Sequence, residues 1–228
     1  MEYTMNALSR MMNVFISPQT TFEAERQKPM WLFPFVLYLI LMVGWTVMVK
    51  PVLQQQQMEI AIEKMQERGM TQEQIDQAVE GMNKMGGVFM WISTFISQII
   101  MFLIVSAVWL FVGNILAGGS LKFPHAMSVT AYSWLVVVVG LLIKAPIILS
   151  KQTINVHFSP AAFLSNEESF IYKLLSQFDL FNIWCFFIVT IGISALTGKK
   201  SKQIWPWTAL LFLLYFVGAS AMQSTFGR

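Results

Sequence analysis

An apolar stretch at residues 30–49 decides the fold, and it reads MWLFPFVLYLILMVGWTVMV without a single charged residue. A helix needs about 20 predominantly apolar residues to cross the hydrocarbon core of a bilayer. The segment must be helical, because an isolated strand would leave backbone hydrogen-bonding groups unsatisfied in lipid. The stretch therefore predicts a membrane-spanning helix at 30–49 and makes the chain an integral membrane protein.

Four more segments meet the same criterion, at residues 88–116, 127–149, 180–196 and 204–222. The second is longer than a span requires, which predicts tilt or an extension beyond the membrane. We therefore expect an all-α integral membrane protein. Its membrane domain, residues 30–222, is a five-span transmembrane helical bundle with amphipathic interfacial helices and an extracytoplasmic helical hairpin.

Composition agrees with this class. Of the 228 residues, 56% are hydrophobic and 12% are charged, about half the charged share of an ordinary globular chain. Such a composition excludes a disordered chain, a nucleic-acid-binding domain and an ordinary soluble enzyme. The first 29 residues contain no apolar run followed by a small-residue cleavage site, so we expect no cleavable signal peptide.

Orientation is inferred from lysine and arginine near the spans. Segments 1–29, 117–126 and 197–203 carry seven such residues in 46 positions, whereas 50–87, 150–179 and 223–228 carry seven in 74. The short loop Thr197-Gly198-Lys199-Lys200-Ser201-Lys202 favours the cytoplasmic side, because a tight basic loop is hard to translocate. We expect a cytoplasmic N-terminus and an outside C-terminus, in a bacterial inner membrane.

The segments outside the hydrocarbon core look helical. In residues 1–29, an apolar stripe of Leu8, Met11, Met12, Phe15 and Ile16 predicts an amphipathic helix, and Ser17-Pro18 opens a second one. In that second helix Phe22 is apolar, and Glu25 and Arg26 are expected on its polar side. These cytoplasmic helices either lie on the membrane surface or dock under the bundle.

The outer loop at 50–87 predicts a helical hairpin. Gly69 is placed to end its first helix, and Thr71-x-x-Gln74 is a capping-box pattern that opens the second. The apolar stripes of the two helices either pack on each other, which we favour, or form a docking surface for a partner. In the outer loop at 150–179, Ser165-x-x-Glu168 predicts another capping box ahead of the fourth span.

Six polar residues predict an intramembrane cluster in the outer half of spans two, three and four: Thr94, Ser97, Gln98, Lys144, Asp179 and Asn182. In this hypothesis Lys144 pairs with Asp179. Ionisable groups inside a membrane are functional candidates. The structural alternative, which we favour, has Lys144 reaching the interface alone and the other five serving as interhelical hydrogen bonds.

Short motifs along the chain resemble those of a known family. Residues 12–34 contain Met-Asn-Val-Phe-Ile-Ser-Pro and then Lys-Pro-Met-Trp-Leu-Phe-Pro; Gly118-Gly119-Ser120-Leu121-Lys122-Phe123 precedes Ala131-Tyr132-Ser133-Trp134; and Asp179-Leu180-Phe181-Asn182-Ile183-Trp184 opens the fourth span. These stretches resemble the bacterial branch of the Yip family, membrane proteins named for interacting with Ypt/Rab GTPases. The resemblance implies a five-span bundle with a cytoplasmic N-terminus. Eukaryotic members act in vesicle traffic through protein partners, but the Asp-Leu-x-Gly-Pro motif associated with them is missing here.

No catalytic constellation or metal-ligand spacing is found, so we expect a protein that is not an enzyme and uses no cofactor or metal. The first functional hypothesis is a non-enzymatic adaptor or subunit in membrane organisation or a membrane transport assembly. Its partners would be membrane lipids and a membrane protein, or a second copy of itself, and not nucleic acid. The alternative is a small-molecule or lipid transporter that uses the polar cluster.

Overall fold

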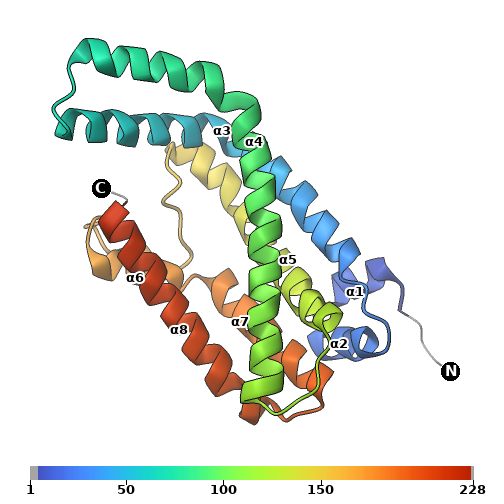
Figure 1. Cartoon of the computed structure of the whole chain (residues 1–228). Coiled ribbons are helices and arrows are strands. Elements are labelled where there is room, and N and C mark those ends of the chain that lie inside the picture. The colour runs from blue at the N-terminus through green and yellow to red at the C-terminus, as the bar shows by residue number, and fades with distance from the viewer. Residues whose placement is uncertain (1–4, 227–228) are drawn as a thin grey trace.

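The computed structural model describes residues 5–226, with the side chains of 83–93 and 225–226 outside that description. The described chain is helical and contains no strand. Its helices are α1 (Ala7–Asn13), α2 (Pro18–Gln27), α3 (Leu32–Glu67), α4 (Gln72–Phe111), α5 (Phe123–Lys151), α6 (Phe170–Gln177), α7 (Leu180–Thr197) and α8 (Ser201–Phe226), with a π-helical turn at Val112–Leu116 and a 3-10 turn at Pro160–Phe163 (Figure 1).

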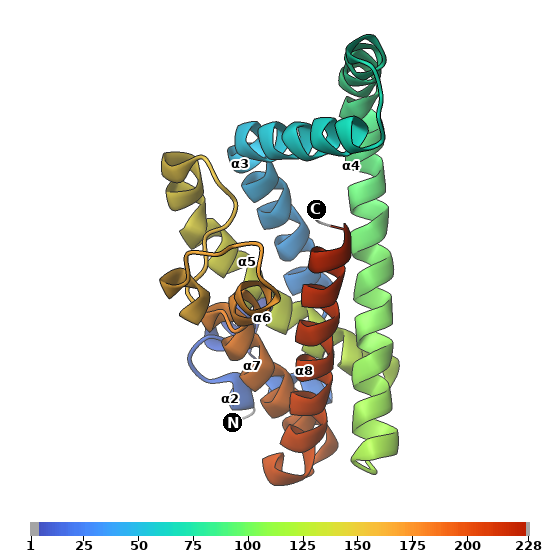
Figure 2. The same cartoon turned by 90° about the vertical axis from the view of Figure 1, so that its left-hand side faces the viewer.

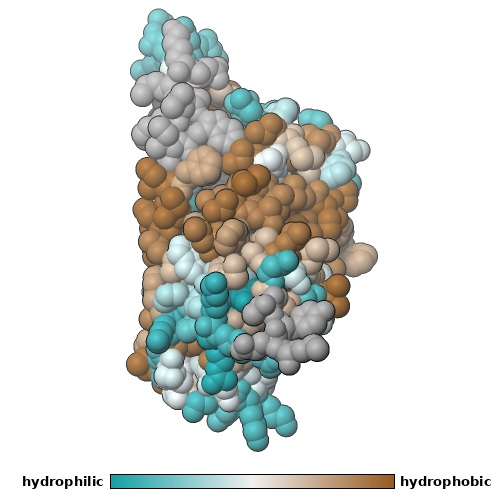
Figure 3. All heavy atoms as spheres, turned by 90° about the vertical axis from the view of Figure 1, so that its right-hand side faces the viewer, coloured by the Kyte–Doolittle hydropathy of each residue, from teal (hydrophilic) through white to brown (hydrophobic). Residues whose placement is uncertain are grey.

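Five helices are long and apolar enough to cross a membrane: Leu32–Glu67, Thr94–Leu116, Phe123–Lys151, Leu180–Thr197 and Ser201–Ser224. They confirm the five-span bundle. The start of the second span, predicted at residue 88, falls among residues whose side chains are not described. Figure 3 shows a hydrophobic belt between the polar ends of the molecule, as a bilayer-embedded bundle requires.

The third and fourth spans form the centre of the bundle. In the apolar windows of α7 and α5, 56% and 44% of residues are buried, against 22–28% in the other three spans. The principal core lies around α5 and α7, and Phe22 of α2 and Phe102 of α4 pack into it. The outer surfaces of α3, α4 and α8 remain apolar and exposed, as lipid-facing helices should be.

The expected hairpin is present, but its two helices are not separate from the spans. α3 runs 36 residues through Pro51 and turns near it, and α4 continues for 40 residues (Figures 1 and 2). Proline removes a backbone hydrogen bond and its ring crowds the preceding turn, so it bends the helix at this point. We call residues 57–82 the hairpin arm.

The turn of the hairpin arm follows the predicted chemistry. Gly69 has a φ of +72°, a left-handed conformation that glycine adopts without a Cβ penalty. Thr71 accepts from the Gln74 backbone, and the Gln74 side chain accepts from the Thr71 backbone, which confirms the capping box. Ile75 is buried in the arm, consistent with mutual packing of the two stripes.

The capping box predicted at Ser165 and Glu168 is wrong. α6 begins at Phe170, and Ser169 is its N-cap, with a hydroxyl that accepts from the Tyr172 backbone. Glu168 instead donates its backbone N–H to the side chain of Asn166 in the preceding turn. The local Asn166 turn competes with the helix for these groups, so the helix starts later.

Docking under the bundle, one of the two alternatives for the N-terminal helices, is confirmed for α2. α2 packs under α7 and buries Phe22 completely. Val14, directly after α1, is buried in the core, whereas Leu8 and Met12 of α1 and Ile16 beyond it are exposed. Leu8 and Met12 are four residues apart and therefore share one side of α1. This apolar side suits insertion into the headgroup region of a bilayer. α2 is therefore docked, and α1 is docked on one side only.

Candidate functional sites at the two ends of the bundle

Lys144 of α5 and Asp179 before α7 form a buried ion pair. Lys144 Nζ donates to Asp179 Oδ2 at 2.7 Å, with the two side chains 11% and 3% exposed. The hypothesised pairing is therefore present, and the favoured alternative, in which Lys144 reaches the interface alone, is wrong. The Lys144 ammonium also lies 5.7 Å from the centre of the Phe158 ring and 5.9 Å from that of Phe181, positions that favour a cation electrostatically.

Asp179 also accepts two backbone hydrogen bonds. Its Oδ1 accepts from the backbone of Phe181 as the N-cap of α7. Its Oδ2 accepts from the backbone of Phe158 at 2.7 Å, which ties the loop after α5 to the start of α7. One carboxylate thus joins two spans and a loop, and its charge is balanced by Lys144.

The six residues of the predicted cluster do not form one group. The side chain of Gln98 accepts from the Tyr38 hydroxyl at 2.8 Å, and Ser97 donates to the carbonyl of Thr94 on its own helix. Asn182 lies near the ion pair but donates to the carbonyl of Gln177. A single cluster is therefore wrong: α4 packs mainly on α5 and α3, which carries its polar residues away from α7.

A wide cleft lies beside the ion pair, with a volume of about 1190 Å³. Lys144, Asp179 and Asn182 all line it, as do residues of the hairpin arm, α5 and α6. Figures 1 and 2 show the upper part of α3 extending above α6 at this end of the bundle. The base of the arm is held where the side chain of Gln56 donates to Thr153 and accepts from the Ile154 backbone.

His157 lines the same cleft from the loop that follows α5. Its ring meets that of Tyr172 edge-on, with centroids 5.9 Å apart. Burial lowers the pKa of His157 from its ordinary value, and the positive charge of Lys144 lowers it further against the opposing effect of Asp179. The lowered pKa favours the neutral form of this imidazole at pH 7.

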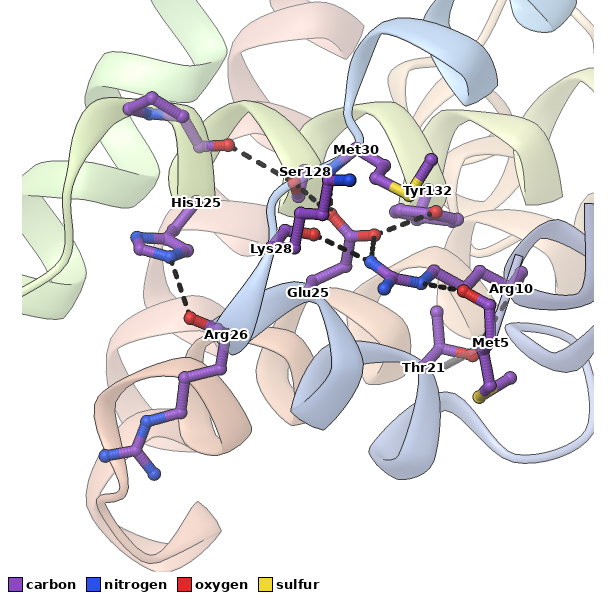
Figure 4. Close-up of polar contacts among 11 residues, drawn as sticks. Met5, Arg10, Thr21, Glu25, Arg26, Lys28, Met30, His125, Ser128 and Tyr132 are labelled. Atoms are coloured by element: carbon purple, nitrogen blue, oxygen red, sulfur yellow. Dashed lines mark hydrogen bonds and ion pairs between the residues drawn. The ribbon is translucent and has the colours of Figure 1, made fainter. Parts of the chain in front are cut away.

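The opposite end contains a polar network that the sequence analysis missed. Glu25 of α2 is completely buried. Figure 4 shows its carboxylate at the meeting point of α1, α2, the start of α3 and α5. Four donors reach this carboxylate: Arg10 Nη1 at 2.6 Å, the Ser128 hydroxyl at 2.6 Å, the Met30 backbone at 2.7 Å and the Tyr132 hydroxyl at 3.1 Å.

The network compensates the burial of both charges. Arg10 is only 5% exposed and also donates to the carbonyl oxygens of Met5 and Lys28. A buried ion pair persists only when further hydrogen bonds satisfy its atoms. The arrangement therefore fixes the two N-terminal helices to the third span and offers no exposed reacting group.

A sequence signal for this network does exist. Phe22 and Glu25 are three residues apart and therefore lie on one side of α2. Ser128 and Tyr132 are four apart, so the apolar third span carries two hydroxyls on one side. Glu25 was expected on the polar side of α2, away from Phe22. That expectation is wrong, because the Phe22 side of the helix faces the bundle and carries Glu25 with it.

No metal site emerges within the described part of the chain, where no three His, Cys, Asp or Glu side chains are grouped to hold an ion. What the geometry defines is a class: a five-span helical membrane protein with its N-terminal helices locked under the bundle and a cleft at the other end. The chain matches the Yip1 domain over residues 12–222, nearly its whole length, and it belongs to that family. No curated protein and no solved structure matches it.

Proposed function

We propose that this Yip1-family protein is a non-enzymatic membrane adaptor or subunit, acting in membrane organisation or in a membrane transport assembly. The observation that supports this role is the hairpin arm, which projects from the bundle and is attached at its base through Gln56. Its partner would be a membrane protein or a second copy of the chain, together with membrane lipids.

The proposed location of the protein is the bacterial inner membrane, with the N-terminus in the cytoplasm. Support comes from the end of the bundle where α2 docks, since Arg26 there lies close to Gly198 of the basic loop between α7 and α8. Lysine and arginine near spans favour the cytoplasmic side. The exposed apolar side of α1 would then lie in the cytoplasmic leaflet.

The test is crosslinking in native membranes followed by affinity capture and mass spectrometry. One variant replaces the hairpin arm with a flexible Gly/Ser linker and keeps Gln56 and the spans. We expect a stoichiometric protein partner with the parent chain and its loss with the variant. A monodisperse variant with an unchanged melting temperature is the folding control. Equal capture by both chains contradicts the adaptor role of the arm.

The second candidate is a small-molecule or lipid transporter, favoured by the cleft that Lys144, Asp179 and Asn182 line. It would use spans three and four, since the polar residues of span two lie elsewhere. Proteoliposome assays of fluorescent phospholipid scrambling and ethidium uptake test it. This candidate requires flux with the parent chain and its loss in Lys144→Met, with assembly intact. No flux above empty liposomes contradicts it.

A further inference from the structure

The cleft beside Lys144 and Asp179 has acidic side chains on two of its sides. Glu59, Glu63 and Glu67 on α3 are spaced by four residues, so they share one side of the hairpin arm, and all three are exposed and line the cleft. Glu167 and Glu168 line it from the other side, just before α6. The glutamates therefore stand on both sides of one opening.

The charge of the lining is opposite to that of the chain. Six carboxylates and two lysines line the cleft, which makes its formal charge −4, whereas the whole chain carries +3. Lys144 already neutralises Asp179. Among the residues that line the cleft, Lys173 is then the one remaining cation beside five glutamates. A cleft lined by one sign of charge concentrates its electric field and attracts the opposite charge.

Part of the lining of the cleft is apolar. These residues come from the first, third and fourth spans: Trp45, Leu53, Val137, Leu141, Ile148 and Phe181. The cleft therefore presents apolar side chains beside its glutamates.

We infer that the cleft binds a basic amphipathic helix of a protein partner, an inference that rests on the adaptor role and specifies its partner. Apolar residues of that helix would pack on the apolar part of the lining. Its lysines and arginines would form ion pairs with the glutamates on both sides. This is the helix-in-groove mode of recognition. The volume of about 1190 Å³ exceeds the roughly 300–1,000 Å³ of small-molecule pockets.

Charge selects this occupant over a phospholipid. The phosphate of a lipid headgroup would lie between the five glutamates, where like charge opposes it. A lysine-rich helix instead replaces unpaired charges by ion pairs within a partly enclosed site. Binding should consequently weaken as salt is added, because exposed ion pairs are screened.

The experiment uses the full chain in zwitterionic nanodiscs, with benzoylphenylalanine in place of Ile60, which is exposed and lines the cleft. The probe is a fluorescent peptide of leucine and lysine in helical amphipathic order. A peptide of the same composition in scrambled order and an acidic amphipathic peptide are the controls. We expect a saturable crosslink with the basic amphipathic peptide alone, and its half-saturation should rise with salt.

Two matched double variants test the charges. Glu63→Gln with Glu67→Gln removes two cleft carboxylates, and Glu73→Gln with Asp76→Asn removes two exposed carboxylates of α4 that do not line the cleft. We expect about fivefold weaker crosslinking with the first and no change with the second, as two exposed ion pairs would give. Both pairs lie on the surface, and melting temperatures verify the fold.

Equal crosslinking with both double variants overturns the inference, and so does a crosslink to phospholipid without any to peptide. These outcomes are distinct from failure of the adaptor role. If native crosslinking still finds a partner that requires the hairpin arm, the adaptor role stands and only the chemistry assigned to the cleft is wrong.

Discussion

Two buried ion pairs hold opposite ends of this bundle, and their surroundings differ. Glu25 is completely buried and accepts four hydrogen bonds, one of them from Arg10. Asp179 also serves several groups, but its partner Lys144 borders the wide cleft and is 11% exposed. The same pairing of charges thus closes one end of the bundle and forms the margin of an opening at the other.

The comparison separates stability from recognition. A carboxylate surrounded by donors is unavailable to a ligand, whereas the glutamates of the cleft have room for one. The docked N-terminal helices are consequently where substitutions should damage the fold most. The cleft should tolerate surface changes and respond in binding.

Glu25→Ala should have the largest effect. It leaves Arg10 buried without its counter-charge, and breaking a buried pair in this way costs about 3–5 kcal/mol of the free energy of unfolding. Thermal unfolding in detergent measures the loss. Glu23→Ala, on the exposed side of α2, is the matched control and should change stability by less than about 0.5 kcal/mol. Equal melting temperatures for the two variants would show that the network contributes nothing.

Asp179→Asn should lower the free energy of unfolding by less, about 1–3 kcal/mol, because it removes a charge from a hydrogen-bonded site. Asparagine caps helices nearly as well as aspartate, so α7 keeps its start. Lys144 can turn toward the cleft, which Arg10 at the closed end cannot do. A double-mutant cycle with Lys144→Met measures the coupling. A loss as large as that of Glu25→Ala would contradict the distinction between the ends.

Much of this structure could be predicted from the sequence, because it depends on residues that are close together in the chain or on opposite charges. The five spans, the turn at Gly69 and the capping box of Thr71 depend on residues close together in the chain. Lys144 and Asp179 were paired because they are opposite charges at one membrane depth. The capping box at Ser165 failed because Asn166 makes a competing turn that a spacing rule does not include.

Long-range docking could not be predicted in the same way. Glu25 receives bonds from Ser128 and Tyr132, which are 103 and 107 residues away. Those contacts exist only after α2 has packed under α7, where Gly192 leaves room for the Phe22 ring. The cleft likewise depends on the direction that α3 takes after Pro51, which composition and periodicity do not specify.

The smallest expected effect is the pH dependence from His157. Because its pKa is lowered in the folded protein, the unfolded chain binds more protons just below pH 6.5, the ordinary value for histidine. Its contribution to stability is therefore complete above that pH and is lost as the pH falls toward the lowered pKa. His157→Gln should reduce the loss of melting temperature between about pH 7.5 and 5.5.

The parent chain, measured over the same pH range, is the control for this experiment. The comparison is direct, because the variant removes one imidazole and keeps a polar side chain. If His157→Gln has the same slope as the parent, His157 is exposed to water in the folded protein. The cleft would then be hydrated around the ion pair of Lys144, and the Lys144 charge would be too screened to affect this histidine.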